Sequence, residues 1–282
     1  MMRQTQRGMT LVIGGTGKTG RRVVERLRAR GLPVRVGSRS GAPPFDWEDR
    51  STWAPVVEGV GLAYVSHHLD AVPGAAETVG SFADLAVKSG VRRLVLMSGR
   101  GEEEADRVEQ AVRDSGAELT VLRSTWFAQN FSEEYWREYV LEGEVALPAG
   151  DTPEPFVDVD DLADVAVAAL TDDRHIGQIY ELTGPRLLTF AQAVEEISRA
   201  TGREIRYAPI SIPEFAAAAA EQGVPGEVID LLTYLFGEVL DGRNAHLADG
   251  VQRALGREPK DFADFARDAA ATGVWNPSAV TA

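Results

Sequence analysis

Short apolar runs alternate with amphipathic stretches along the first two thirds of this 282-residue chain. The runs are typical of buried strands and lie at residues 10–13, 32–36, 62–65, 93–97, 119–122 and 178–182. Helical spacing fills several of the intervals, most clearly at 75–88 and 102–114, and both of these stretches are followed by Ser-Gly. Strands that alternate with helices predict a parallel sheet covered on both faces. We therefore expect an α/β, doubly wound fold.

The alternation becomes less regular after residue 122. We expect a short third strand at residues 45–46, an aromatic stretch at 126–139, a loop at 147–155, a strand at 156–159 and a helix at 161–170. From residue 185 onward the pattern is mainly helical, with one or two short extended pieces. This organisation predicts a core formed by residues 1–125 and 156–183. A smaller, mainly helical C-terminal lid region would take in residues 126–155 and 184–282.

Three glycines follow the first strand with the spacing Gly14-x-x-Gly17-x-x-Gly20. Gly14 permits a sharp turn, Gly17 has no Cβ to hold a pyrophosphate away from the backbone, and Gly20 lets the following helix lie close to the strand. Strand, turn, helix and second strand together form the unit of roughly thirty residues that a Rossmann-type dinucleotide site requires. The segment predicts these cofactor-binding residues: Gly14, Thr16, Gly17, Lys18, Thr19 and Gly20.

A phosphate-binding loop of the Walker type is the alternative interpretation, because Gly17-Lys18-Thr19 is how such a loop ends. A Walker sequence also needs a glycine five residues before Gly17, and that position is Val12, inside the first strand. The spacing therefore favours dinucleotide binding over nucleoside triphosphate hydrolysis.

The second strand is followed by Ser38 and Arg39, where an NAD-binding protein would place an acidic residue on the ribose 2′-hydroxyl. A guanidinium is always charged and can grip phosphate oxygens with two parallel donors, which suits the 2′-phosphate of NADP(H). An ordinary surface arginine is the alternative in a chain rich in arginine. The position favours NADP(H) as the cofactor, with Ser38 and Arg39 binding it.

The formal net charge of −14 and the absence of cysteine narrow the classes of function. A negative field repels nucleic acid, so we expect no nucleic-acid partner. Without cysteine there is no disulfide, thiol catalysis or thiolate metal site. No apolar run approaches 18 residues and the first eight residues are polar, so we expect no membrane association and a cytoplasmic location.

The chain resembles the NmrA-like family of atypical short-chain dehydrogenases/reductases over nearly its whole length. The matching segments are Gly14 to Gly20, the basic residue after the second strand, Phe45-Asp-Trp-Glu-Asp49, Val91-Arg-Arg-Leu-Val-Leu-Met-Ser98, Ser115-Gly116, Val121-Leu-Arg-Ser-Thr-Trp-Phe-Ala-Gln-Asn-Phe131 and Phe156-Val-Asp-Val-Asp-Asp161. Two of them look most like the branch that contains the festuclavine dehydrogenases, which reduce an iminium bond with NADPH. The resemblance implies that Asp46 and Trp47 lie at the cofactor. Other branches reduce quinones or bind the nucleotide to sense redox state.

One departure concerns the Tyr-x-x-x-Lys pair, in which lysine lowers the tyrosine pKa so that the phenol exchanges a proton with the substrate. No tyrosine of this chain has lysine four residues later. The helix that should carry the pair offers Asp106, Arg107 and Glu109 instead. An iminium substrate needs no proton donor, because its nitrogen already carries the charge that hydride neutralises. We therefore expect an NADP(H)-dependent reductase of an imine or iminium, with quinones and enones as further substrates, or else an NADP(H)-sensing protein without catalysis or a non-redox enzyme.

The residues expected to serve catalysis are His67, Ser98, Trp126 and Asn130. His67, with its neighbour His68, follows a strand where family members pass close to the cofactor, and it is expected to orient nicotinamide or donate a proton. Ser98 ends the next strand and is expected to bond substrate or cofactor. No third ligand has metal spacing relative to the histidines, so we expect no metal.

The aromatic stretch would suit an aromatic or cationic small-molecule substrate. Its members are Trp126, Phe127, Phe131, Tyr135 and Trp136, for which a plain core is the alternative. Asp158, Asp160 and Asp161 look like paired carboxylates, but Asp160 and Asp161 fit the N-cap and first turn of a helix, and Arg123 fits an ion pair, so we interpret these four as structural. We expect the chain to be a monomer or a homodimer.

Overall fold

The computed structural model describes residues 8–67, 72–133 and 135–277, and its Cα positions form two compact units. Unit 1 consists of Met1–Ser124, Val159–Leu182 and Asp249–Arg257, and unit 2 of Thr125–Asp158, Thr183–Ala248 and Glu258–Ala282. The division differs from the expected one chiefly at Asp249–Arg257. This segment belongs with unit 1, although the lid region was expected to take in all residues after 183.

Unit 1 contains a six-stranded parallel sheet in the order β2-β1-β3-β4-β5-β7. The strands are β1 Met9–Ile13, β2 Val34–Gly37, β3 Val60–Val65, β4 Arg93–Gly99, β5 Glu118–Ser124 and β7 Ile179–Leu182. The chain adds β2 on one side of β1 and β3 on the other, so strand order reverses at β1. This sheet confirms the predicted α/β, doubly wound fold.

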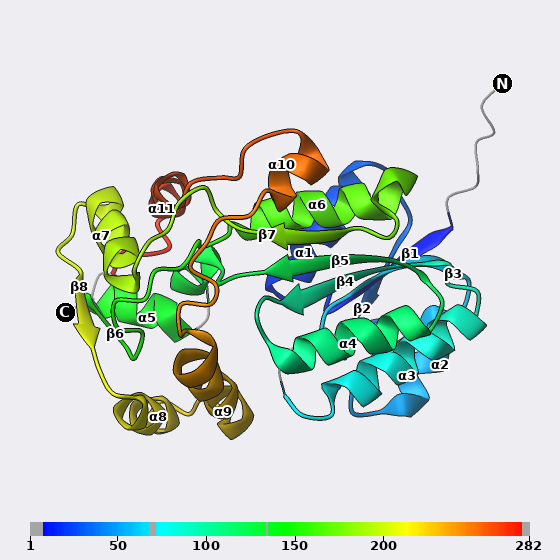
Figure 1. The fold of residues 1–282 in the computed structure, drawn as a ribbon, viewed down its shortest axis with the longest axis horizontal. Coiled ribbons are helices and arrows are strands. Elements are labelled where there is room, and N and C mark those ends of the chain that lie inside the picture. Colours follow the sequence, from blue (N-terminus) through cyan, green and yellow to red (C-terminus); the bar gives the residue numbers. More distant parts are fainter. Residues whose placement is uncertain (1–7, 68–71, 134, 278–282) are drawn as a thin grey trace. The chain divides into compact units, whose positions relative to one another are not determined.

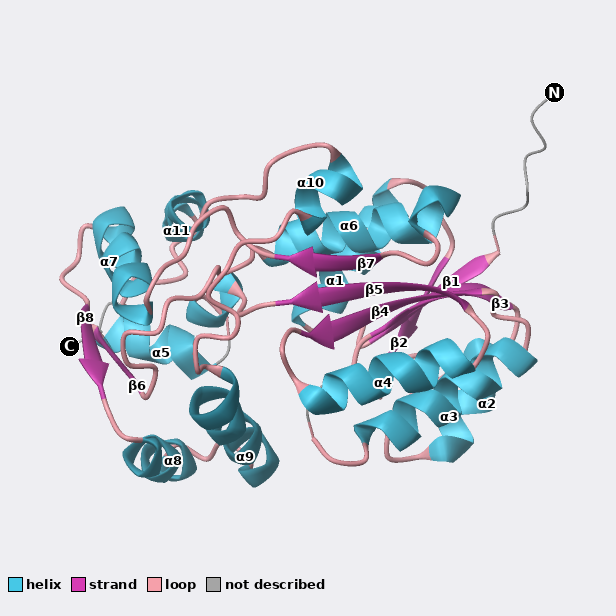
Figure 2. Ribbon diagram, in the orientation of Figure 1, coloured by secondary structure: helices cyan, strands magenta, loops and turns pink. Residues whose placement is uncertain are grey.

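Helices cover both faces of the sheet (Figures 1 and 2). One face carries α1 (Lys18–Ala29) and α6 (Val159–Thr171), which pack together, and the other carries α2 (Trp53–Val57), α3 (Ala75–Lys88) and α4 (Glu103–Asp114). The short helix α10 (Gly250–Leu255) packs against β7 and α6. The 3-10 turns Arg50–Thr52 and Asp173–His175 complete unit 1.

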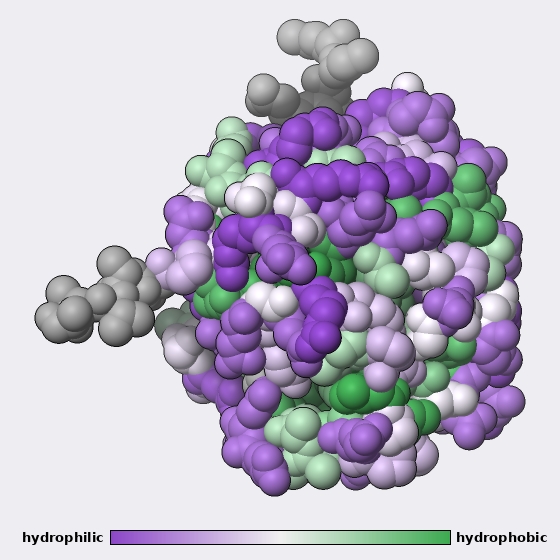
Figure 3. All heavy atoms as spheres, turned by 90° about the vertical axis from the view of Figure 1, so that its left-hand side faces the viewer, coloured by the Kyte–Doolittle hydropathy of each residue, from purple (hydrophilic) through white to green (hydrophobic). Residues whose placement is uncertain are grey.

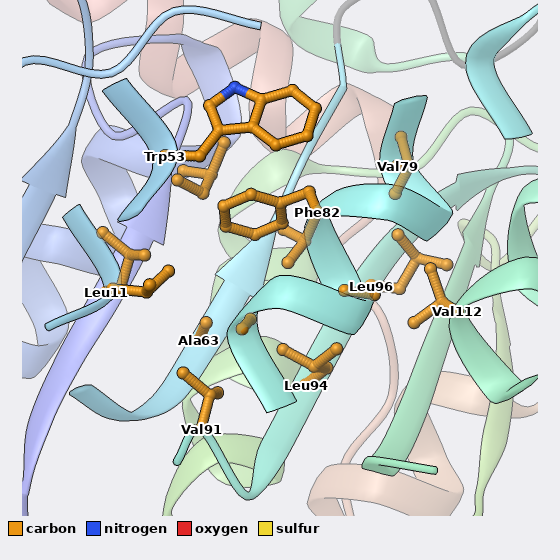
Figure 4. Close-up of a cluster of buried hydrophobic side chains, with 14 of the residues drawn as sticks. Leu11, Trp53, Ala63, Val79, Phe82, Val91, Leu94, Leu96 and Val112 are labelled. Carbon is orange, nitrogen blue, oxygen red and sulfur yellow. The ribbon is translucent and has the colours of Figure 1, made fainter. Parts of the chain in front are cut away.

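Large apolar side chains fill the layer between the sheet and helices α2, α3 and α4. In this layer Leu11, Leu94 and Leu96 of the strands meet Trp53 of α2 and Phe82 of α3 (Figure 4). All five are at most 2% exposed. Because the strands are buried, their segments appear in the sequence as continuous apolar runs.

The expected third strand at residues 45–46 is wrong. Phe45 is buried in the core of unit 1, but the backbone of Asp46 bonds to side chains and joins no sheet. Its N–H donates to Thr52 Oγ1 at 3.0 Å and its carbonyl accepts from Trp53 Nε1 at 2.8 Å. These side-chain bonds use the groups through which a strand would pair.

Unit 2 combines helices with a small parallel sheet. Its elements are the 3-10 turn Ala128–Phe131, α5 Tyr135–Glu142, β6 Glu144–Leu147, α7 Phe190–Thr201, β8 Arg206–Pro209, α8 Ile212–Glu221, α9 Gly226–Tyr234, a π-helical turn Leu235–Val239 and α11 Phe262–Ala271. β6 and β8 pair to form the sheet. Capping boxes begin α7, where Thr189 pairs with Gln192, and α8, where Ser211 pairs with Glu214.

The strand expected at residues 156–159 is also wrong. Val157 forms a single parallel bridge with Phe127, and α6 already begins at Val159. Phe156 and Val157 are buried, but this single bridge is not a ladder of strand pairs.

Figure 3 shows one face of the molecule, on which hydrophilic side chains predominate and hydrophobic ones form small scattered patches. Among the described residues, no helix has both the length and the apolar character needed to cross a membrane.

Candidate functional site

The three glycines after β1 form a turn that a larger residue would not fit. Gly14 has φ +68°, in the left-handed region that favours glycine. A Cβ on Gly20 would lie 2.2 Å from the carbonyl oxygen of Gly14, so α1 and the turn are in backbone contact. The Gly17 N–H donates to this same carbonyl at 2.9 Å. The structure therefore brings Gly14, Gly17 and Gly20 together as one turn.

The first turn of α1 has the properties of an anion site. Gly17 is the N-cap residue, no side chain caps the helix, and no acidic residue lies in the first turn. Thr16 and Gly17 are exposed, and Lys18 is half-buried. Thr19 is different, because it is buried and its hydroxyl accepts a 2.9 Å hydrogen bond from Tyr64. The uncapped N–H groups and the missing Cβ at Gly17 fit a pyrophosphate.

Arg39 lies just beyond the end of β2, beside the glycine turn. β2 ends at Gly37, whose carbonyl accepts a 3.0 Å hydrogen bond from the Gly14 N–H. The Arg39 side chain is exposed and forms no hydrogen bond or ion pair with any described residue. Ser38 Oγ lies 3.4 Å from Ser40 Oγ. Two hydroxyls and a guanidinium that has no partner among the described residues therefore lie just beyond the end of β2.

Trp47 and His67 are in ring contact, with centroids 4.8 Å apart. Trp47 also contacts the rings of Phe45, Trp53 and Phe82 and is 8% exposed, which makes it part of the core of unit 1. His67 is buried, two residues beyond β3. The Asp46 carboxylate is half-buried and accepts from the Glu48 N–H at 3.1 Å. His68 lies outside the described residues.

Ser98 forms a hydrogen-bonded network with Glu109 and Arg123 in the region where the sequence lacks the Tyr-x-x-x-Lys pair. Its hydroxyl donates to Glu109 Oε1 at 2.8 Å, and Arg123 Nε and Nη2 donate to Glu109 Oε1 and Oε2 at 2.8 and 2.7 Å. The hydrogen bond to Glu109 raises the pKa of the Arg123 guanidinium above its ordinary value. The prediction that Arg123 is an ion-pair partner is confirmed.

Two further ion pairs were not anticipated from the sequence. Arg100, directly after β4, has a buried side chain whose Nε lies 3.1 Å from Glu181 on β7. In unit 2, Lys260 lies 3.4 Å from the buried carboxylate of Asp158. An arginine directly after a buried strand is a signal that could have found the first pair. The second joins residues about a hundred positions apart, and no local pattern reveals it.

The acidic residues around the start of α6 are structural, as expected. Asp160 lies 2.8 Å from Arg26 Nη2, and Asp161 lies 2.6 Å from Arg257 Nη1. These ion pairs join the start of α6 to α1 and to Arg257, which follows α10. They act in addition to any effect of the two carboxylates on the start of α6.

Unit 2 places Trp126, a candidate from the sequence, in a stack of aromatic rings. Its centroid is 5.5 Å from that of Trp136 and 4.9 Å from that of Phe236, with interplanar angles of 25° and 27°. Asn130 is half-buried in the 3-10 turn that follows Trp126. His67 and Ser98 thus belong to unit 1, and Trp126 and Asn130 to unit 2.

A parallel sheet whose strand order reverses at β1, with a glycine turn leading to an uncapped helix N-terminus, defines a Rossmann-type dinucleotide-binding protein. The model of the NmrA-like family matches residues 103–261. The chain belongs to this family.

Curated relatives match the chain along nearly its whole length. It is 33% identical to the uncharacterized oxidoreductase YesF of Bacillus subtilis, over 94% of this chain and 97% of the relative. It is 32% identical to agroclavine dehydrogenase of Claviceps fusiformis, over 92% and 96%. Among solved structures, Citrobacter sp. triphenylmethane reductase complexed with NADP(H) is 19% identical with a TM-score of 0.74, covering 93% of this chain and 99% of that one. This last likeness supports the fold.

Proposed function

We propose that this chain is an NADP(H)-dependent reductase that transfers hydride to a small organic substrate, with an imine or iminium favoured over a quinone or enone. The names of its relatives support an oxidoreductase, since one is an agroclavine dehydrogenase and another an oxidoreductase. The proposal includes a cytoplasmic location and a monomeric or homodimeric chain that acts without a nucleic-acid or membrane partner.

The residues around the β1–α1 turn fit the cofactor. Gly17 and the uncapped start of α1 would hold the pyrophosphate, and Arg39 with Ser38 would hold the 2′-phosphate. NADP(H) supplies hydride when it is bound. In this proposal the chain orients the nicotinamide through His67 and the strand ends of unit 1, while Trp126 and Asn130 contact the substrate.

The Ser98–Glu109–Arg123 network is the observation that favours an imine or iminium. The only hydroxyl proton of Ser98 is donated to Glu109, and a guanidinium stays protonated at neutral pH. Neither group is a ready proton donor for an alkoxide formed from a ketone. An iminium carbon accepts hydride and its nitrogen becomes a neutral amine, so this step needs no donated proton. Ser98 Oγ retains lone pairs that would accept a hydrogen bond from a substrate or nicotinamide N–H.

The same network supports the second candidate, an NADP(H)-sensing protein without catalysis. A buried ion pair in place of Tyr-x-x-x-Lys is also what a chain that only binds the nucleotide would retain. A non-redox enzyme with the same fold is a third and weaker hypothesis.

Turnover separates these candidates. We expect NADPH absorbance at the nicotinamide band to fall when the protein meets a cyclic iminium salt, and to fall more slowly with an enone and with a simple ketone. Binding of NADPH without turnover of any imine, quinone or enone would contradict the reductase and leave the sensor or non-redox enzyme.

Cofactor choice is tested by Arg39→Asp. Because the guanidinium would bond only the 2′-phosphate, we expect NADPH affinity to fall at least about tenfold and NADH affinity to change little. Arg28→Asp is the matched control, since Arg28 is exposed in the last turn of α1 and forms no side-chain bond with described residues. Both affinities are measured by nicotinamide fluorescence. Equal losses for the two cofactors would rule out the 2′-phosphate assignment.

A further inference from the structure

Two buried hydroxyl groups meet at the start of α1, one from the helix and one from the sheet. Tyr64 lies on β3 with 0% of its surface exposed, and its phenol donates to Thr19 Oγ1 at 2.9 Å. Thr19 is the second residue of α1 and is 6% exposed. The hydrogen bond therefore ties the middle of the sheet to the helix turn that follows the three glycines.

This hydrogen bond uses only one of the two hydroxyl hydrogens. The Tyr64 hydrogen lies between the two oxygens, so the hydrogen of Thr19 has to point away from Tyr64. Among the residues that the structure describes, no group accepts the Thr19 hydrogen. A helical threonine can donate to the carbonyl four residues earlier, as Thr171 does to Val167 at 2.7 Å, but Thr19 forms no such bond. A buried donor is costly to leave unused, so an acceptor from outside the chain is favoured.

The surroundings of Thr19 favour an acceptor that is negatively charged. The N–H groups in the first turn of a helix have no carbonyl within the helix to receive them. No side chain caps α1, and its first turn contains no acidic residue. The N–H group and the hydroxyl of Thr19 therefore both belong to the positive end of the helix, where an anion is stabilised.

We propose that Thr19 Oγ1 donates its hydrogen to the pyrophosphate of the bound dinucleotide, and that Tyr64 is a positioning residue that fixes this hydroxyl in the donating orientation. A hydroxyl that accepts one hydrogen bond is polarised and becomes a better donor for the next. The phenol thus also strengthens the bond to the phosphate, although it does not touch the ligand. The inference deepens the proposed function and rests on it for the identity of the dinucleotide.

Two probes test the assignment by isothermal titration calorimetry of the full-length protein. NADP⁺ contains the pyrophosphate, whereas adenosine 2′-monophosphate contains only the adenosine and the 2′-phosphate. We expect Thr19→Val to weaken NADP⁺ binding about tenfold, as the loss of a hydrogen bond to a charged group does, and to leave the affinity for adenosine 2′-monophosphate unchanged. Tyr64→Phe should give the same pattern with a loss of about threefold. Arg39→Asp, in contrast, should weaken the binding of both probes.

The double variant separates ligand binding from packing. Thr19→Val removes the acceptor of the Tyr64 hydrogen, so this single variant should unfold at a lower urea concentration. Tyr64→Phe in the same chain removes the donor as well, and the replacement of both partners by apolar groups restores much of the stability. We expect the double variant to regain stability and still to bind NADP⁺ as weakly as Thr19→Val. A purely structural pair would regain affinity together with stability.

Two other buried hydroxyls of unit 1 provide matched controls. Thr120 Oγ1 donates to the His175 carbonyl at 2.7 Å, and the Tyr180 hydroxyl lies 2.8 Å from His175 Nδ1. Both side chains are at most 4% exposed, and they lie in the first halves of β5 and β7, whereas ligands lie beyond the carboxyl ends of such strands. Thr120→Val and Tyr180→Phe should lower the urea midpoint and leave the affinities for both probes unchanged.

Unchanged NADP⁺ affinity in Thr19→Val, which a hydroxyl bonded only to water would give, would overturn the proposal. Equal losses for the two probes would also overturn it, because they would show a distorted site. If a single variant does not fold, the double variant still decides.

The titrations involve no turnover, so they are independent of the reductase assay. A loss confined to NADP⁺ in a protein that reduces no imine, quinone or enone would support the assignment and remove the reductase. Turnover combined with unchanged NADP⁺ affinity in Thr19→Val would remove the assignment and retain the reductase. Absence of NADP⁺ binding by the unmodified protein would remove both.

Discussion

Gly20 shows how one missing side chain allows α1 to start beside the glycine turn. A Cβ there would lie 2.2 Å from Gly14 O, whereas one on Gly17 would lie 3.3 Å from the same atom. The first distance requires the backbone to move, and the second requires a shift of a few tenths of an ångström. Position 20 therefore controls packing, and in the proposed function position 17 would set how closely the pyrophosphate approaches the backbone.

This contrast predicts different outcomes for two alanine variants. We expect Gly20→Ala to lower the free energy of unfolding by about 1–3 kcal/mol, as overpacking does, and to weaken NADPH binding as well. We expect Gly17→Ala to weaken NADPH binding with a smaller loss of stability. Urea unfolding and cofactor titration measure the two effects. A Gly20→Ala protein as stable as the unmodified one would contradict the packing argument.

His175 is a buried histidine outside the candidate site. Its Nδ1 lies 2.8 Å from the Tyr180 hydroxyl, and Arg174 Nε donates to its Nε2 at 3.1 Å. Burial, and then the charge of Arg174, lower the pKa of His175 below its ordinary value. The folded protein therefore holds this ring neutral at pH values where an unfolded chain would protonate it.

Stability should consequently fall as pH decreases. Below about pH 6.5 the unfolded state binds a proton that the native state binds only at lower pH, so the loss develops between the unfolded and folded pKa values. We expect His175→Asn to flatten the dependence of the unfolding free energy between pH 7 and pH 5. His246→Asn is the control, because His246 is exposed. An unchanged pH dependence in the His175 variant would contradict this account.

At the scale of elements, α10 is a short helix held by contacts along its whole length. Arg253 lies over the Tyr180 ring at 5.2 Å and donates to Gln178 Oε1, and Arg174 donates to the Ala254 carbonyl. A Cβ on Gly250 would lie 2.1 Å from the Glu181 carbonyl oxygen on β7. Close backbone approach at Gly250 is what allows the other contacts to form.

We expect Gly250→Ala to displace α10 from β7 and to speed amide hydrogen exchange across residues 249–257. Gly256→Ala is the control at the other end, where φ is +70° and no atom lies within 4 Å of an added Cβ. That variant should strain the helix end by about 1 kcal/mol and leave the N-terminal contacts of α10 in place. Unchanged exchange in Gly250→Ala would show that the close approach is dispensable.

The strands and helices of unit 1 were largely predictable because their signals are local. Apolar runs marked all six strands, and Ser-Gly after residues 88 and 114 marked where α3 and α4 end. The pair β6 and β8 was harder to identify, since Glu144–Leu147 and Arg206–Pro209 are each four residues long and pair across about sixty positions. Asp46 is not part of a strand, because the side chains of Thr52 and Trp53 form hydrogen bonds with its backbone.

The candidate site was predictable where one motif carries it and not where distant residues meet. The turn of Gly14, Gly17 and Gly20 could be predicted from their spacing together with the strand before them and the helix and second strand after them. That Glu109 receives Ser98 and Arg123 depends on how α4 packs on β4 and β5, which no single motif encodes.

At the scale of the whole molecule, unit 1 is formed from separate stretches of the sequence: Val159–Leu182 and Asp249–Arg257 join the N-terminal part that ends at Ser124. Arg93 on β4 has a 2% exposed side chain that pairs with Asp173 and donates to the Ala169 carbonyl, both after residue 158. We expect a fragment of residues 1–124 to show no cooperative urea unfolding by circular dichroism, because it lacks α6, β7 and these partners of a buried charge. The full chain is the control. Cooperative unfolding of the fragment would contradict the prediction.

The chain passes between the units five times, at residues 124–125, 158–159, 182–183, 248–249 and 257–258. Unit 2 is therefore encoded by three separate stretches of gene, interrupted by stretches that encode the sheet edge and α10. Recombination between homologous genes can replace the stretch for residues 183–248 with two crossovers and leave the codons of the glycine turn untouched. Diversification of what unit 2 contacts can thus proceed stretch by stretch, while the nucleotide turn is inherited intact.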